Sequence, residues 1–377
     1  MKPCYALGLL LAATGPALAQ TAPTADPALA VPPSAAPAEA TPAPLVFYGF
    51  VDAYFGYDFQ APRTNARPGF FYSHARQNEF TVNNAVLGLR YQDAKVRGAV
   101  GLHAGSYVAA NYAAEEPVFK HIYEAYVGFR PTQKTWLDVG IFGSHIGFES
   151  ALSKDNWTLT RSLMAENSPY YEAGARFTYE AAPTLTLTAV VLNGWQNIRE
   201  TNQAKALGTQ VQWKPTDKLL VNSSTFYGNE QPQDSTRRRR YFHDFYASYA
   251  ATDCLSLAVV FDVGKQEQAG RGTRPDTWHA GAALVRYQLA QQWRTALRAE
   301  YYHAAHGVIV NSISPRADAA NFRVYGASLG LDYAPAANVL FRVEGRLLGA
   351  PEPIFQRQDN RTSNRYGNLT SSLAFAF

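Results

Sequence analysis

The sequence has 377 residues, of which 47% are hydrophobic and 13% aromatic, while only 17% are charged and the formal net charge is +4. This small charge argues against a nucleic-acid partner, and two cysteines, Cys4 and Cys254, are too few for a disulfide framework or a cysteine-based zinc site. After the first 20 residues no run of about 18 apolar residues occurs, which excludes a membrane-spanning helix.

Residues 1–19 have the pattern of a secretory signal peptide. Lys2 supplies the positive start, Ala6–Ala13 form a short apolar core, and Ala17-Leu18-Ala19 is a small-x-small cleavage site. A buried N-terminal helix is the alternative interpretation. We therefore expect an exported protein.

Residues 20–44 consist mainly of Ala, Pro and Thr. A proline-rich segment cannot donate a hydrogen-bond ladder or bury a core, so it is predicted to be a disordered linker that serves as a spacer. A role in binding peptidoglycan or a partner is the alternative. The folded domain is then expected at residues 45–377.

Apolar and polar residues alternate along many segments of residues 45–377, as in β-strands with one apolar face. Leu255–Val263 carries apolar residues at its odd positions, and Leu369–Phe377 does so at most of them. A soluble β-sandwich would show the same alternation, so the periodicity alone does not decide between a sandwich and a barrel.

Short turns and long loops alternate strictly along the same region. The short turns are expected at residues 92–94, 131–134, 181–184, 215–217, 251–253, 290–292 and 335–337. The long loops, rich in Gly, Asn, Arg and Pro, are expected at about 60–77, 106–120, 143–169, 195–205, 229–240, 266–275, 304–320 and 350–365. This count predicts an all-β, transmembrane antiparallel β-barrel of about 16 strands, because short turns at one end and long loops at the other are typical of outer-membrane barrels.

Aromatic residues on the apolar parity form two groups. Next to the short turns are Tyr91, Phe129, Tyr179, Trp213, Tyr249, Tyr287, Trp293, Tyr333 and Phe377. Near the long loops are Tyr57, Phe59, Tyr123, Tyr171, Tyr227, Tyr301 and Tyr325. Two such belts, separated by aliphatic residues, match the two interfaces of a lipid bilayer.

Charged residues occupy the opposite parity and are the candidates for lining a pore. They are Arg90, Arg97, Glu124, Asp138, Glu172, Arg176, Asp262, Arg286, Arg298, Glu300, Asp332, Arg342, Glu344 and Arg346. Because unpaired charges are costly in a dry core, we expect them to face a wide, water-filled lumen. With Asp52 and Asp244 included, seven arginines stand against nine carboxylates, which predicts at most weak and mildly cationic ion selectivity.

Several segments resemble the OmpL-like β-barrel porin-2 family of Gram-negative outer membranes. The likeness is carried by Arg67–Phe80 (RPGFFYSHARQNEF), Asn111–Glu124 (NYAAEEPVFKHIYE), Leu137–Glu172 with its SHIGFESALSKDNWTLTRSLMAENSPYYE, Val191–Gln196 (VLNGWQ), Tyr241–Tyr246 (YFHDFY), Arg298–Val310 (RAEYYHAAHGVIV) and Arg342–Arg346 (RVEGR). The resemblance covers nearly all of residues 45–377 and implies an outer-membrane porin without naming a substrate.

The longest loop, residues 143–169, is the best candidate for a pore constriction, with an outward cap on the rim as the alternative. Its charged residues are Glu149, Lys154, Asp155, Arg161 and Glu166. Charges of both signs across a constriction would favour hydrated polar solutes. The run Arg237–Arg240 is expected either to attract anionic solutes or lipopolysaccharide phosphates, or to be a solvated loop.

An enzyme is disfavoured, because no histidine has a serine two positions away, the spacing that places both on one strand face. His303 and His306 are too isolated a pair to predict a metal site. The sequence predicts no enzyme activity, cofactor or metal. It predicts a porin for passive diffusion of small hydrophilic solutes or ions, with a non-conducting barrel of binding or envelope-structural role as the alternative. The expected partners are outer-membrane lipid, lipopolysaccharide and, through the C-terminal strand, the barrel-assembly machinery. A homotrimer is left open.

Overall fold

The computed structural model describes residues 45–268, 274–310 and 321–377. The predicted signal peptide and linker lie outside the described residues. No helix among the described residues is long and apolar enough to cross a membrane.

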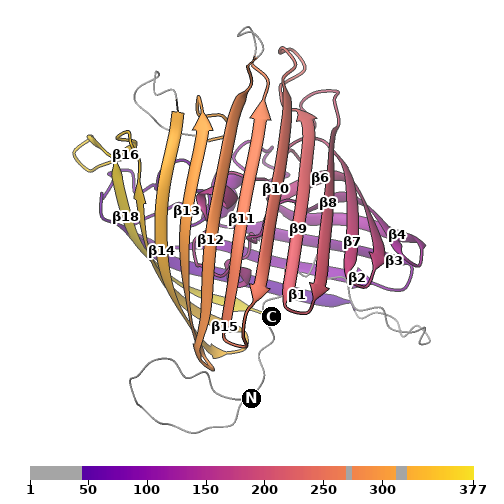
Figure 1. The fold of residues 1–377 in the computed structure, drawn as a ribbon, viewed down its shortest axis with the longest axis horizontal. Helices are drawn as coiled ribbons and strands as arrows, with labels where there is room; N and C mark the ends of the chain where they lie inside the picture. The colour runs from indigo at the N-terminus through magenta and orange to yellow at the C-terminus, as the bar shows by residue number, and fades with distance from the viewer. Residues whose placement is uncertain (1–44, 269–273, 311–320) are drawn as a thin grey trace.

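Sixteen antiparallel strands close into one barrel, which confirms the predicted fold class (Figure 1). The barrel strands are β1 (Val46–Asp58), β2 (Phe80–Gln92), β3 (Val96–Ala104), β4 (Ile122–Thr132), β5 (Thr135–Gly143), β6 (Tyr171–Ala182), β7 (Leu185–Leu192), β8 (Ala206–Thr216), β9 (Leu219–Asn229), β10 (Arg239–Ala250), β11 (Leu255–Gln266), β12 (Asp276–Ala290), β13 (Trp293–Ala305), β14 (Asn321–Ala336), β15 (Val339–Gly349) and β18 (Arg365–Ala376). Antiparallel pairing of β1 with β18 closes the barrel.

The remaining elements lie in the long loops. The helices are α1 (Ser106–Asn111), the 3-10 turn η1 (Ser153–Asp155) and α2 (Leu163–Glu166). A small ribbon of β16 (Phe355–Gln356) and β17 (Thr362–Ser363) lies between β15 and β18.

Short connections and long loops separate to opposite ends of the barrel, as predicted. In Figure 1 the short turns and the C-terminus lie at the lower end and the long loops at the upper end. Three prolines expected in turns, Pro131, Pro215 and Pro335, instead lie in the last residues of β4, β8 and β14. The strand register shifts next to each of them, which fits the exclusion of proline from a regular ladder.

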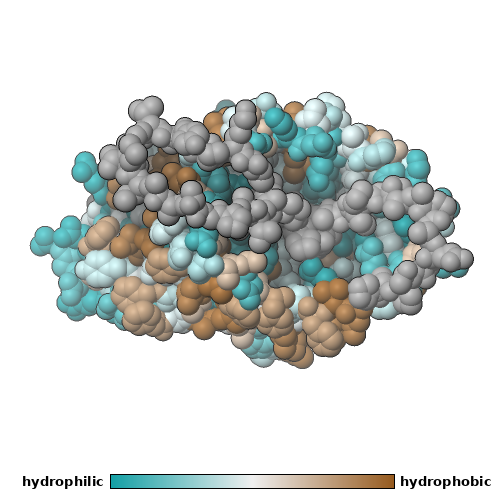
Figure 2. Space-filling view, turned by 90° about the horizontal axis from the view of Figure 1, so that it is seen from below, coloured by the Kyte–Doolittle hydropathy of each residue, from teal (hydrophilic) through white to brown (hydrophobic). Residues whose placement is uncertain are grey.

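The outer wall is apolar and carries most of the predicted aromatic residues. Aliphatic side chains such as Val259 and Leu329 are more than half exposed. At the short-turn end Phe129, Trp213 and Phe377 are exposed, and near the long loops Tyr325 is exposed. Figure 2, seen from below, shows apolar residues along the outer wall at the lower edge of the view and polar residues in the hollow between the walls.

Tyr123 and Tyr171 do not belong to the aromatic belt, so the prediction is wrong for both. Tyr123 lines a cavity inside the barrel. The Tyr171 ring is only 2% exposed and stacks on Tyr112 at 4.0 Å between centroids. Its hydroxyl donates to Glu115 at 3.0 Å. The loop that contains α1 covers this end of β6, which alternation along a strand does not reveal.

Placing a charge on the outer wall should destabilise the barrel. Val259 lies in the middle of β11, is 53% exposed and pairs with Ala247 and Ala283. Val259→Arg should lower the free energy of unfolding by about 2–4 kcal/mol, because the guanidinium would lie near the bilayer midplane. Urea unfolding in lipid vesicles measures this, with Val259→Leu as the control. Equal urea midpoints for the two variants would contradict the assignment of this face to lipid.

Candidate functional site

The loop between β5 and β6, residues 144–170, lies inside the barrel and is called the inner loop below. Near its start, His145 contacts the backbone of β9. Further on, the Ser153 hydroxyl donates to Asp52 of β1 at 2.7 Å, and Thr160 contacts Glu344 of β15. The inner loop therefore crosses the lumen and is not a cap on the rim.

Wall residues of β13 and β15 bind the middle of the inner loop. Glu344 accepts hydrogen bonds from the Thr160 N–H at 2.7 Å and from its hydroxyl at 2.6 Å. Arg298 donates to the same carboxylate at 3.2 Å and to Thr158 Oγ1 at 2.6 Å. Arg298 and Glu344 are fully buried, so each depends on these partners for its charge.

A second wall pair binds the start of α2. Glu300 accepts a hydrogen bond from the Leu163 N–H at 2.7 Å, and Arg346 donates to both its oxygens at 2.8 Å. On β15, Arg342 forms a two-point ion pair with Asp332 at 2.8 and 3.0 Å. Arg342 also donates to inner-loop carbonyls, including that of Trp157 at 3.1 Å.

His145 fixes the start of the inner loop to the facing wall. Its Nδ1 lies 2.8 Å from Glu172 and its Nε2 lies 2.9 Å from the Thr225 carbonyl. Both partners only accept hydrogen bonds, so both ring nitrogens must donate and the side chain is an imidazolium. Burial opposes this charge, but the Glu172 carboxylate outweighs burial and raises the pKa of His145.

The loop between β1 and β2, residues 59–79, also enters the lumen, which the sequence interpretation missed. Arg67 donates to Asp58 at 3.0 Å and to Thr370 at 2.8 Å, and Glu166 of the inner loop accepts from the Tyr72 N–H at 2.9 Å. Phe70 and Phe71 are almost fully buried. The two adjacent phenylalanines in an otherwise polar loop were the feature of the sequence that could have predicted this burial.

Most of the pore-lining candidates lie on the inner face but are buried. Glu124, Asp138, Glu172, Arg176, Asp262, Arg298, Glu300, Asp332, Arg342, Glu344 and Arg346 are buried. Arg90, Arg97 and Arg286 are partly exposed. The expectation that these charges face a wide, water-filled lumen is wrong. Most of them are buried and paired. The inner loop supplies partners to the wall residues of β13 and β15, such as Arg298 and Glu344, whereas Asp138 pairs with the wall arginines Arg97 and Arg176.

The constriction-loop candidates separate into two groups. Glu149, Arg161 and Glu166 are buried, while Lys154 and Asp155 are partly exposed and pair at 2.7 Å. Burial raises the pKa of Glu149, although Arg298 lies 3.7 Å away. Arg161 lies 3.9 Å above the ring centre of Tyr170 and 3.3 Å from Glu166.

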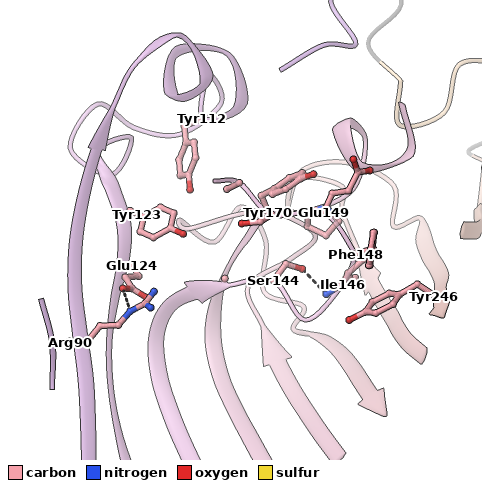
Figure 3. Close-up of a pocket in the computed structure, with 15 residues that line it drawn as sticks. Arg90, Tyr112, Tyr123, Glu124, Ser144, Ile146, Phe148, Glu149, Tyr170 and Tyr246 are labelled. Carbon is pink, nitrogen blue, oxygen red and sulfur yellow. Dashed lines mark hydrogen bonds and ion pairs between the residues drawn. The ribbon is translucent and has the colours of Figure 1, made fainter. Parts of the chain in front are cut away.

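A cavity of about 70 Å³ remains between the inner loop and the wall formed by β2 and β4 (Figure 3). On the wall side, Arg90 donates to Glu124 at 2.8 Å and lies 4.6 Å from the ring centre of Tyr48. The inner-loop side contributes Glu149 and Tyr170. The full lining is Arg90, Tyr112, Tyr123, Glu124, Gly143, Ser144, Ile146, Gly147, Phe148, Glu149, Ser150, Ala151, Pro169, Tyr170 and Tyr246.

The cavity has both aromatic faces and polar groups, and its Arg90–Glu124 pair is internally neutralised. Such a lining suits a small hydrated solute better than an apolar one. The Ser144 hydroxyl in its lining donates to Glu172 at 2.8 Å, while His145 contacts that carboxylate and not the serine. Among the described residues, no group of three or more His, Cys, Asp or Glu could hold a metal ion.

A serine–histidine contact does occur elsewhere, between neighbouring strands. The Ser223 hydroxyl lies 2.8 Å from His243 Nε2 on the exposed outer face of β9 and β10. A search for both residues on one strand could not find this cross-strand pair. No described residue hydrogen-bonds the other ring nitrogen, so the pair lacks the orienting group of a catalytic triad.

Comparisons with known proteins agree on the fold. The family model described as "Putative beta-barrel porin-2, OmpL-like" matches residues 44–377. No curated protein matches the sequence.

Three solved structures of low sequence identity share the fold. The outer-membrane channel DcaP of Acinetobacter baumannii is 13% identical, with 89% of this chain and 98% of that chain covered and a TM-score of 0.59. The anion-selective porin from Comamonas acidovorans is 8% identical, with 89% and 100% covered and a TM-score of 0.58. OmpT of Vibrio cholerae in its trimer form is 10% identical, with 89% and 100% covered and a TM-score of 0.58.

Proposed function

Because the chain belongs to the β-barrel porin-2, OmpL-like family, we propose that it is an outer-membrane porin through which small hydrophilic solutes or ions diffuse passively. It admits solutes according to their size and charge and performs no reaction on them. The inner loop narrows the path, and the cavity beside Arg90 and Glu124 is where a solute passes it.

The observation that carries this proposal is the uneven packing of the inner loop. Toward β13 and β15 the loop is fixed by buried ion pairs and leaves no exposed charge at Arg298 or Glu344. Toward β2 and β4 it leaves the polar cavity of Figure 3. A path between the inner loop and β2 and β4 therefore needs less rearrangement of the loop than a path beside β13 and β15.

Planar-bilayer conductance of the purified protein tests the function directly. Stepwise currents support the porin. A folded, heat-modifiable barrel that gives no current supports the alternative, a non-conducting barrel with a binding or envelope-structural role.

Filling the cavity should reduce the current. Ala151 lines the cavity and is partly exposed. Ala151→Trp should lower the single-channel conductance by about half or more, because the indole would occupy the narrow part of the path. Ala151→Ser, which adds one oxygen, is the control. Equal conductance of both variants would place the path elsewhere in the barrel.

Export, barrel assembly and oligomer formation involve parts of the chain outside the pore. We propose that the signal peptide of residues 1–19 directs export, that residues 20–44 form the spacer, and that the barrel-assembly machinery recognises the C-terminal strand. A homotrimer is the proposed assembly, by analogy with the trimer form of OmpT from Vibrio cholerae.

The proposed contact with lipopolysaccharide phosphates lies on the outer rim. Arg239 is exposed at the start of β10, and Lys265 and Arg323 are exposed on β11 and β14. Arg240, the next residue of the arginine run, is less exposed and lies 5.1 Å from the ring centre of Trp195. The run therefore divides between different environments, and only its exposed part suits a phosphate.

A further inference from the structure

Arginines on the inner face of β2, β3 and β4 each lie close to a carboxylate. Arg90 pairs with Glu124 at 2.8 Å and Arg130 with Glu180 at 3.3 Å, while Arg97 lies 2.6 Å from Asp138, which also binds Arg176 of β6 at 3.0 Å. The first two pairs are close to neutral and the Asp138 group has one excess positive charge, but every one of these arginines has a carboxylate within ion-pair distance.

The inner face of β12–β15 departs from this rule near the short turns. Here Arg286, Arg294 and Arg342 surround one carboxylate, Asp332, and we call these four residues the basic cluster. Asp332 lies directly opposite Arg294 on one side and Arg342 on the other in the strand pairing. Gln288 lies opposite Arg294, and Arg286 is two positions before it on the same face of β12. Diagonal neighbours of this kind are within reach of long side chains.

Arg342 alone occupies both oxygens of the Asp332 carboxylate. Arg342 forms two hydrogen bonds to it at 2.8 and 3.0 Å, whereas Arg294 approaches only to 3.9 Å. Arg286 has no carboxylate within ion-pair distance among the described residues, and its guanidinium lies 4.7 Å from the ring centre of Trp157. Lys154 and Asp155 of the nearby η1 turn neutralise each other at 2.7 Å. The basic cluster therefore has an excess of two positive charges.

The uncompensated arginines are also the accessible ones. The Arg294 side chain is 24% exposed and Arg286 is partly exposed, while Arg342 is fully buried. A partly desolvated guanidinium without an anion is unfavourable, and its planar fork of donors fits an oxyanion at two points. The wall residues next to the arginines in the strand pairing are small, with Ala296 opposite Arg286 and Gly330 opposite Ala296.

We propose that Arg286 and Arg294 form an anion-binding subsite on the inner wall, which takes the carboxylate or phosphate group of a solute and gives the channel a preference for anions. This inference rests on the proposed porin function. It also replaces the near-balance expected from the sequence, because most of the charges counted there are buried and paired, and only accessible charges act on an ion in the path.

Ion selectivity of the purified barrel in a planar bilayer tests the subsite. Under a KCl gradient the wild-type chloride-to-potassium permeability ratio should exceed one, and in Arg286→Gln/Arg294→Gln it should fall about twofold or more. Inorganic phosphate and succinate should each reduce the wild-type chloride current, and the double variant should need about tenfold more of either. The anion effective at the lower concentration identifies phosphate or carboxylate as the better ligand.

The matched control removes the same charge at the short turn between β8 and β9. Lys214→Gln/Lys218→Gln changes two exposed lysines and should leave the permeability ratio and the phosphate effect unchanged. Equal behaviour of wild type and Arg286→Gln/Arg294→Gln would overturn the subsite while leaving the porin function intact.

Absence of current in all variants would instead contradict the porin function. The subsite is then tested by isothermal titration calorimetry of the detergent-solubilised barrel with inorganic phosphate and with succinate. Binding by the wild type that is lost in Arg286→Gln/Arg294→Gln supports it, and no binding by the wild type overturns it.

Discussion

Glu344→Ala is expected to raise the single-channel conductance about twofold or more, because it releases the middle of the inner loop from the wall. Glu344 is fully buried and accepts hydrogen bonds from Thr160 and Arg298. Its removal takes the acceptor away from both Thr160 donors and breaks the buried ion pair with Arg298, which typically costs about 3–5 kcal/mol. Moving Thr160 away from the wall lets water reach these donors, and the lumen widens.

The control for this experiment removes a wall carboxylate that does not contact the inner loop. Glu180 of β6 pairs with Arg130 at 3.3 Å and is partly exposed. Glu180→Ala should keep the wild-type conductance within the scatter of single-channel recordings. If Glu344→Ala folds and conducts like Glu180→Ala, the inner loop does not limit the current.

If Glu344→Ala fails to fold, the conservative variant Glu344→Gln serves in its place. The amide oxygen can still accept one hydrogen bond from Thr160, but the charge that balances Arg298 is lost. We expect an intermediate conductance with more frequent switching between levels, because the loop is then held less firmly. A single level equal to that of the wild type would contradict the role of this contact.

The barrel wall could be predicted from the sequence because its signals are local. Alternation places Val259 and Leu329 outside and Arg298 and Glu344 inside, and each choice depends only on the parity of a residue within its own strand. The lengths of the turns then determine the number of strands. These rules need no knowledge of which strands meet.

The interior could not be predicted in the same way, because it depends on contacts between distant segments. Arg342 alternates like a water-facing residue, yet it is buried by carbonyl groups of Asn156 and Trp157, nearly 190 positions earlier. No property of β15 alone indicates that a loop will reach it. The excess charge at Arg286 was hidden for a related reason, since a count of all inward charges gives buried pairs the same weight as accessible ones.

Deleting Phe377 is expected to lower the amount of folded barrel by a factor of about 5–30, because the residue closes the seam between β1 and β18. The Phe377 N–H donates to the Gly49 carbonyl and the Gly49 N–H to the Phe377 carbonyl, both at 3.0 Å. Each such hydrogen bond contributes about 1 kcal/mol. Heat-modifiable mobility on gels measures the folded fraction, and Phe377→Tyr, which keeps the backbone and an aromatic ring, is the control.

The deletion has two separate effects, and the seam allows them to be distinguished. A terminal aromatic residue is also the expected signal for the barrel-assembly machinery, so the deletion alone does not show which role matters. The Phe377 ring lies over Gly49 so closely that a Cβ at that position would come within 2.2 Å of it. In Gly49→Val the Phe377 ring must move away from β1, which removes its packing on the seam while the C-terminal residue stays in place. If the seam is the main contribution, Gly49→Val and the deletion should both refold poorly into lipid vesicles in the absence of any assembly machinery. The other outcome is that both variants refold normally in vesicles, but only the deletion variant gives less folded barrel in cells. That outcome would show that Phe377 acts in recognition by the assembly machinery.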